Sequence, residues 1–112
     1  MEDSILNSIK KMLGIPEDYD AFDTDVIIDI NAAFFTLNQL GIGPEDGFAI
    51  TGKNEVWSSF LGYESKFEAV KMYVYIKVRL VFDPPTSAFV LEAMKKQADE
   101  LEWRLNAQAE TA

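Results

Sequence analysis

The sequence contains neither cysteine nor histidine. Without cysteine the chain can form no disulfide and has no thiol chemistry, which suits a reducing compartment. Without histidine it lacks the commonest general base and the commonest metal ligand of proteins. We therefore expect no enzyme: no catalytic residues, no zinc site and no cofactor.

Long apolar runs are also missing. A membrane span needs roughly 20 apolar residues, and Lys71, Lys77 and Arg79 interrupt the best candidate. Glu2 and Asp3 stand where a signal peptide would carry basic residues. We therefore expect a soluble protein that has no membrane partner.

Basic residues are scarce, with 10 Lys and Arg against 19 Asp and Glu and a net charge of −9. This balance disfavours ordinary nucleic-acid binding, which places cations against phosphates. Residues 12–52 contain no Lys or Arg, whereas residues 66–96 are mildly basic. The split is compatible with a solvated surface of uneven charge, or with a surface that docks head-to-tail on a copy of itself, as in rings.

The acidic half contains a cluster that superficially resembles a calcium loop, with Asp29 eleven residues after Asp18; its acids are Asp18, Asp20, Asp23, Asp25 and Asp29. A calcium loop requires glycine at its sixth position and usually ends in glutamate, and this segment has Asp23 and Asp29 there. We therefore expect no metal site. Helix capping and solvation of the first helical turn explain these acids.

Periodicity and stop signals predict a single domain over residues 1–112. Helices are expected at 4–13, 23–40, about 55–61, 66–82 and 86–106, with Asp23 as an N-cap and a Ser65–Glu68 capping box. Residues 42–65 are expected to be irregular, with a short strand at 48–50. Alternating residues at 73–80 also allow a strand, but the capping box and the Asp-Pro-Pro stop favour helix. The predicted fold class is all-α, a small bundle of four to five helices with a long irregular excursion between the second helix and the next long one.

The 66–82 helix is apolar on two sides. Val70, Val74, Val78 and Val81 form one arc, and a second arc on nearly the opposite side comprises Ala69, Met72, Tyr73, Ile76 and Leu80. Such a helix is buried on two sides, either as the central post of the core or at an interface with another chain.

Several side chains fall outside the predicted core and are candidates for contact with partners. Ile28 and Phe35, together with the Lys71, Tyr75 and Arg79 strip of the 66–82 helix, form the candidate subunit interface. Phe89, Trp103 and Arg104 on the last helix are candidates for contact with a partner or neighbour, because aromatic residues often anchor interfaces.

The irregular excursion contains three further aromatic residues, Trp57, Phe60 and Tyr63. They form a candidate contact loop toward a neighbour or a tail component. In the alternative interpretation, Trp57 and Phe60 cap the small core.

Five segments together resemble the small head–tail connector (adaptor) proteins of long-tailed bacteriophages, and the likeness extends from Ser4 to Asn106. The segments are 5–15 (ILNSIKKMLGI), Asn31 with 37–41 (LNQLG), Trp57, 75–85 (YIKVRLVFDPP) and 102–106 (EWRLN). The order of the segments and the aromatic-basic helix that ends in Asp-Pro-Pro make the match fairly specific.

The resemblance implies a structural virion protein at the head–tail junction, assembled in the host cytoplasm. Connector proteins form a ring of about twelve copies under the portal protein, extend the DNA channel and dock a stopper or tail-completion protein. The C-terminal helix of the family packs toward the portal, which would assign that contact to the Trp103 end. Genomic DNA would pass the ring without specific binding, and Asp18, Asp20 and Asp23 are the candidate channel-facing acids.

A small acidic binding module, such as a DNA-mimicking inhibitor of a host protein, is the alternative function. Such mimics usually spread carboxylates along their whole length, and the basic stretch at 66–96 disfavours this interpretation.

Overall fold

The computed structural model describes residues 4–61 and 67–111, and these residues form five helices and no strand. The helices are α1 (Ile5–Leu13), α2 (Asp23–Gln39), α3 (Trp57–Leu61), α4 (Phe67–Phe82) and α5 (Ala88–Thr111). The all-α prediction is confirmed, and residues 73–80 are helical throughout. Among the described residues, no helix is long and apolar enough to cross a membrane.

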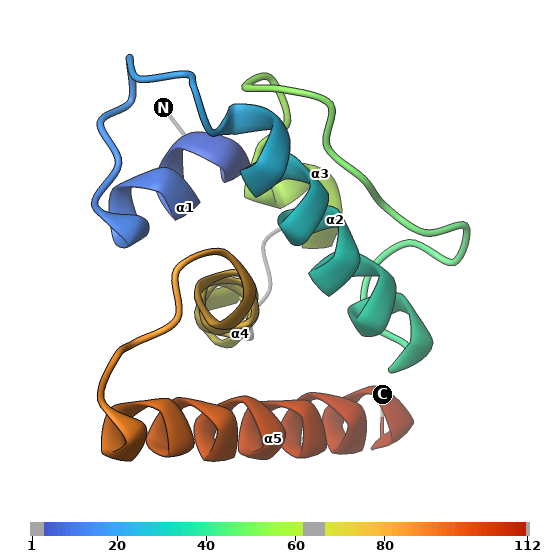
Figure 1. Cartoon of the computed structure of the whole chain (residues 1–112). Helices are drawn as coiled ribbons and strands as arrows, with labels where there is room; N and C mark the ends of the chain where they lie inside the picture. The colour runs from blue at the N-terminus through green and yellow to red at the C-terminus, as the bar shows by residue number, and fades with distance from the viewer. Residues whose placement is uncertain (1–3, 62–66, 112) are drawn as a thin grey trace.

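Helix α4 lies at the centre of the molecule, between α1 and α2 on one side and α5 on the other (Figure 1). Val70, Val74 and Val78 are fully buried in the core cluster that also contains residues of α1 and α2. Ile76 and Ala98 are buried outside that cluster, consistent with the direct packing of α4 on α5. The helix is therefore buried on both sides by its own chain, as a core post.

Val81 was expected in the first buried arc, and this prediction is wrong. Its side chain is 70% exposed, because the last turn of α4 borders an open pocket and not the core. Met72 of the second arc is also partly exposed.

Both ends of α1 are capped, and the glycine stop after the helix agrees with the prediction. The Ser4 hydroxyl accepts a hydrogen bond from the Asn7 amide at 3.0 Å. Gly14 adopts a left-handed conformation with φ of 80°, and its N–H and that of Ile15 donate to the carbonyls of Lys11 and Lys10. The chain can therefore reverse direction sharply after α1.

The start of α2 differs from the prediction. Phe22 occupies the N-cap position without a side-chain cap, and Asp23 is the first helical residue. The carboxylate of Asp23 pairs with Lys10 and does not cap its own helix. The predicted Ser65–Glu68 capping box includes Ser65, which lies outside the described residues.

The excursion between α2 and α3 contains no strand at 48–50, so that prediction is wrong. The Asn31 side chain replaces a partner strand, because its amide oxygen accepts from the Ile50 N–H at 2.7 Å and its amide nitrogen donates to the Ile50 carbonyl at 3.0 Å. Among the described residues, the only β-type pairing is an isolated bridge between Ser4 and Val56.

Aromatic packing fixes the same excursion from the inside. The Phe34 ring lies 4.6 Å from the Phe60 ring and 5.2 Å from the Phe48 ring, measured between centroids. Gly43 has φ of 89°, and a Cβ there would overlap the Phe60 ring. The loop is therefore folded tightly onto the helical core.

Helix α5 forms the outer layer opposite α1 and α2 (Figure 1). Leu105 is buried at its C-terminal end, where the Asn106 side-chain amide donates to the Leu40 carbonyl at 3.3 Å. Much of the remaining helix surface is exposed. One side of α5 thus stays available for other contacts.

Candidate assembly surfaces

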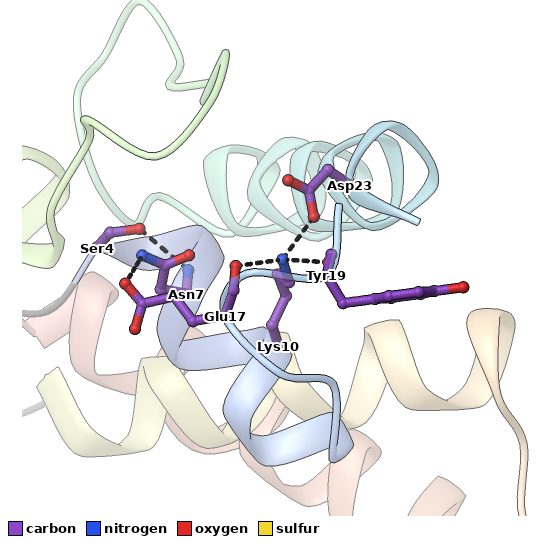
Figure 2. Close-up of polar contacts among 6 residues, drawn as sticks. All are labelled: Ser4, Asn7, Lys10, Glu17, Tyr19 and Asp23. Carbon is purple, nitrogen blue, oxygen red and sulfur yellow. Dashed lines mark hydrogen bonds and ion pairs between the residues drawn. The ribbon is translucent and has the colours of Figure 1, made fainter. Parts of the chain in front are cut away.

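A buried lysine organises the acidic turn between α1 and α2 (Figure 2). Lys10 is fully buried, and its ammonium group donates to the carbonyl oxygens of Glu17 at 3.0 Å and Tyr19 at 2.7 Å. Its third partner is the Asp23 carboxylate at 2.8 Å. The ammonium group thus has two hydrogen bonds and one ion pair, and such pairing is the condition under which a buried cation is tolerated.

The three candidate channel-facing acids differ in their surroundings, because only one of them belongs to the buried ion pair. Asp23 pairs with Lys10 and its side chain is only 18% exposed, so it contributes little to an acidic surface. Asp18 and Asp20 are exposed on the turn that Lys10 holds. Their orientation toward a channel stays a prediction. Within the described parts of the chain, no three acids lie close enough to hold a metal ion.

An open groove of about 650 Å³ lies where the end of α1, the first half of α2 and the last turn of α4 meet. Leu13, Ile15, Phe22, Ile28, Val81 and Phe82 line its apolar part, and Asp25, Asp29 and Asp83 supply carboxylates. Ile28 is 60% exposed and Phe22 is 42% exposed. A groove that combines exposed apolar side chains with acids suits a partner surface that is apolar and basic.

The acids of the groove lack cations. None of the three carboxylates has an ion-pair partner within residues 4–61 and 67–111. Partial burial, followed by the negative charge of Asp25, raises the pKa of the Asp29 carboxyl above its ordinary value. The groove therefore holds negative charge that the described chain leaves uncompensated.

The outer face of α2 continues from this groove. Ile28, Ala32 and Phe35 follow one another at helical spacing and are all exposed, with Phe35 at 64%. The structure thus places both α2 candidates on one accessible face. Their contact with another subunit stays a prediction.

The Lys71, Tyr75 and Arg79 strip is half-buried and partly engaged by its own chain. Arg79 donates to the Asp83 carbonyl at 2.7 Å and to the Tyr75 hydroxyl at 3.2 Å. The ammonium group of Lys71 lies 5.8 Å from the Trp57 ring centroid. These contacts shape the strip, and its contact with a neighbour remains a prediction.

Among the described residues, helix α5 carries the most exposed aromatic side chains. Phe89 is 83% exposed and Trp103 is 72% exposed, and both lie on the side away from the buried Ala98. Lys96 lies between them at seven-residue spacing and is also exposed. Arg104 pairs with Glu100 at 2.7 Å. We call Phe89, Lys96 and Trp103 the outer stripe of α5.

Trp57 and Phe60 belong to the core. They are 2% and 5% exposed, and the Trp57 indole N–H donates to the Ser8 hydroxyl at 2.9 Å. This burial favours the core-capping alternative for these two side chains over direct contact with a partner. Tyr63, the third member of the candidate loop, lies outside the described residues.

The sequence interpretation missed Lys10 and the groove. Lys10 follows Leu6 by four residues, so it lies on the apolar face of α1. A lysine on an apolar face, followed by an acid-rich turn, was a usable signal for a buried ion pair. The groove had no such signal, because Val81 is distant in sequence from Phe22 and Ile28.

Comparison with known families shows that residues 5–112 match the family described as phage connector protein. The match covers nearly the whole sequence, so the chain belongs to this phage connector family. Neither curated proteins nor solved structures gave a match. Membership assigns the chain to the structural connector components of phage virions, a class that is typically non-enzymatic.

Proposed function

We propose that this chain forms a ring under the portal of the filled phage head, where it extends the DNA channel and docks the stopper or tail-completion protein. The observation that carries the proposal is membership in the phage connector family over residues 5–112. The ring would contain about twelve copies and would be part of the mature virion after assembly in the host cytoplasm.

The distribution of exposed apolar side chains supports a subunit role. Ile28 and Phe35 lie on α2, whereas Phe89 and Trp103 lie on α5, and α4 separates these two helices (Figure 1). A ring subunit needs two different surfaces, one for each neighbour. Exposed aromatic and branched side chains on two sides of a small protein meet this requirement. Family membership also favours the connector over the DNA-mimicking alternative.

We further propose that the acidic turn faces the channel. Asp18 and Asp20 are exposed, and carboxylates repel the phosphates of passing DNA. Replacing both with asparagine is expected to slow DNA release from assembled particles, with replacement of the distant Asp46 as a control. Normal release from the doubly neutralised particles would contradict this assignment.

Electron microscopy of the purified protein, alone and mixed with the portal protein of the same phage, tests the proposal. The expected result is a ring of this chain seated coaxially on the portal ring. Particles in which the portal never carries added density, at any protein ratio, would overturn the proposed function.

A further inference from the structure

Two exposed apolar surfaces of the described chain differ in charge. The groove between α2 and the end of α4 presents Ile28 and Val81 beside Asp25 and Asp29. No lysine or arginine in the described chain pairs with these acids. The groove therefore favours an apolar partner that brings its own cation.

The outer stripe of α5 has the complementary composition. Lys95 pairs with Glu92 at 3.7 Å, and Arg104 pairs with Glu100 at 2.7 Å. Lys96 has no acidic partner among residues 4–61 and 67–111. It lies between Phe89 and Trp103, about 10 Å along the helix from each, since each residue advances the helix by about 1.5 Å.

The two surfaces lie on opposite sides of α4. Helix α2 packs on one side of α4, and α5 packs on the other (Figure 1). The outer stripe of α5 points away from α4, because the buried residues Ala98 and Leu105 occupy its inner side. One copy therefore cannot close its own stripe onto its own groove, whereas a second copy can.

On the basis of the ring function proposed above, we propose that the groove of one copy binds the outer stripe of α5 from the next copy. Trp103 packs against Ile28 and Val81, and Lys96 pairs with Asp25 and Asp29. Because the two surfaces differ, the contact is heterologous and repeats from copy to copy until a ring closes. The occupant of the groove is thus a second copy of this chain, and the outer stripe is not the portal contact.

Cross-linking tests the pairing directly, because the natural chain has no cysteine to interfere. The double variant Ile28→Cys with Trp103→Cys is treated with a short bismaleimide after rings have formed on the portal. The expected product is a ladder of covalent multimers, whereas either single variant gives no ladder. Both positions are exposed, so the circular dichroism spectrum and unfolding midpoint should match those of the unsubstituted chain.

Charge reversal tests the polar part of the contact. Lys96→Glu is expected to weaken self-association by about tenfold, and Asp25→Lys in the same chain is expected to restore most of it. Lys95→Glu is the matched control, since it makes the same charge change on a neighbouring side of α5 and should have little effect. Trp103→Ala is expected to weaken association by roughly 30-fold, as for an aromatic anchor.

The outcomes separate this inference from the proposed function. Rings that form normally but give no ladder overturn the inference and leave the ring function intact. Covalent dimers from Ile28→Cys alone would indicate a symmetric contact, and linkage of Trp103→Cys to the portal would assign α5 to the portal. Either result overturns the inference. Absence of rings with and without portal overturns both proposals.

Discussion

Lys10 is fully buried, and its ammonium group joins three parts of the chain that are separated in sequence. It ties α1 to the acidic turn through the carbonyls of Glu17 and Tyr19, and to α2 through Asp23. The acids of this region are therefore not all surface charges. Asp23 instead compensates the charge of the buried Lys10.

Replacement of Lys10 with methionine keeps the apolar stem and removes the charge. It leaves two carbonyl groups and the Asp23 carboxylate without their donor. Breaking one side of a buried pair costs about 3–5 kcal/mol, so the free energy of unfolding should fall by that amount. Chemical denaturation measures it, and Lys11→Met, at the exposed neighbouring position, is the control. Equal stability of the two variants would contradict the structural role of Lys10.

Substitution of Asp29 is expected to change the free energy of unfolding in the opposite direction, toward higher stability. Burial, and next the charge of Asp25, raise the pKa of its carboxyl above 3.8, so the folded state binds the proton more tightly than the unfolded state. Its contribution to stability therefore falls as the pH rises from its unfolded pKa through its folded pKa. Asp29→Asn should raise the free energy of unfolding of the monomer at pH 7 by up to about 0.5 kcal/mol, and the gain should vanish below about pH 3.

Denaturation curves at the two pH values check this, with Asp46→Asn as the exposed control. A loss of stability at pH 7 would mean that the ionised Asp29 has a stabilising partner. In that case the groove would not hold uncompensated charge.

At the scale of elements, one polar side chain of α2 anchors the buried part of the excursion between α2 and α3. Asn31 satisfies both the N–H and the carbonyl of Ile50, a residue that is only 2% exposed. Asn31→Ala should therefore lower the free energy of unfolding by about 1–3 kcal/mol and speed hydrogen exchange at the Ile50 amide. Asn38→Ala is the matched control, because its bonds to Pro44 and Glu45 are exposed. Unchanged exchange at Ile50 in Asn31→Ala would show that aromatic packing alone holds the loop.

Elements with strong local signals were predictable from the sequence. The Gly14 stop and the two apolar arcs of α4 each follow from residues within a few turns of one another. The strand at 48–50 and the Asp23 cap were wrong because tertiary partners replaced the local ones. Asn31 took the place of a neighbouring strand, and Lys10 took the Asp23 carboxylate.

The candidate surfaces were predictable only in part. Periodicity identified Ile28, Phe35, Phe89 and Trp103 as outside the core, and all four are exposed. The same reasoning wrongly placed Val81 in the buried arc, because a helical wheel does not show where the neighbouring helix ends. The groove is a product of three segments meeting, and no local pattern encodes it.

At the scale of the whole molecule, the arrangement has two unlike surfaces on opposite sides of α4 (Figure 1). Unlike surfaces predict a specific mixing behaviour. Ile28→Asp should block the groove and Trp103→Asp should block the outer stripe, so each variant alone should remain monomeric. A mixture should form one-to-one dimers and nothing larger. The intact stripe of the Ile28→Asp chain binds the intact groove of the Trp103→Asp chain, and the dimer then has only the two substituted surfaces left.

Sedimentation velocity of the two variants, alone and mixed, measures this. All samples are measured without portal, and unsubstituted protein at the same concentration provides the reference for self-association. A mixture that remains monomeric while the reference assembles would contradict a heterologous contact between these two surfaces.

Native mass spectrometry of the chain bound to its portal is the decisive measurement of ring formation. A connector is expected to give one discrete complex that holds a closed ring of about twelve copies for each portal ring. A persistent monomer that ignores the portal and instead binds a host protein would contradict the account.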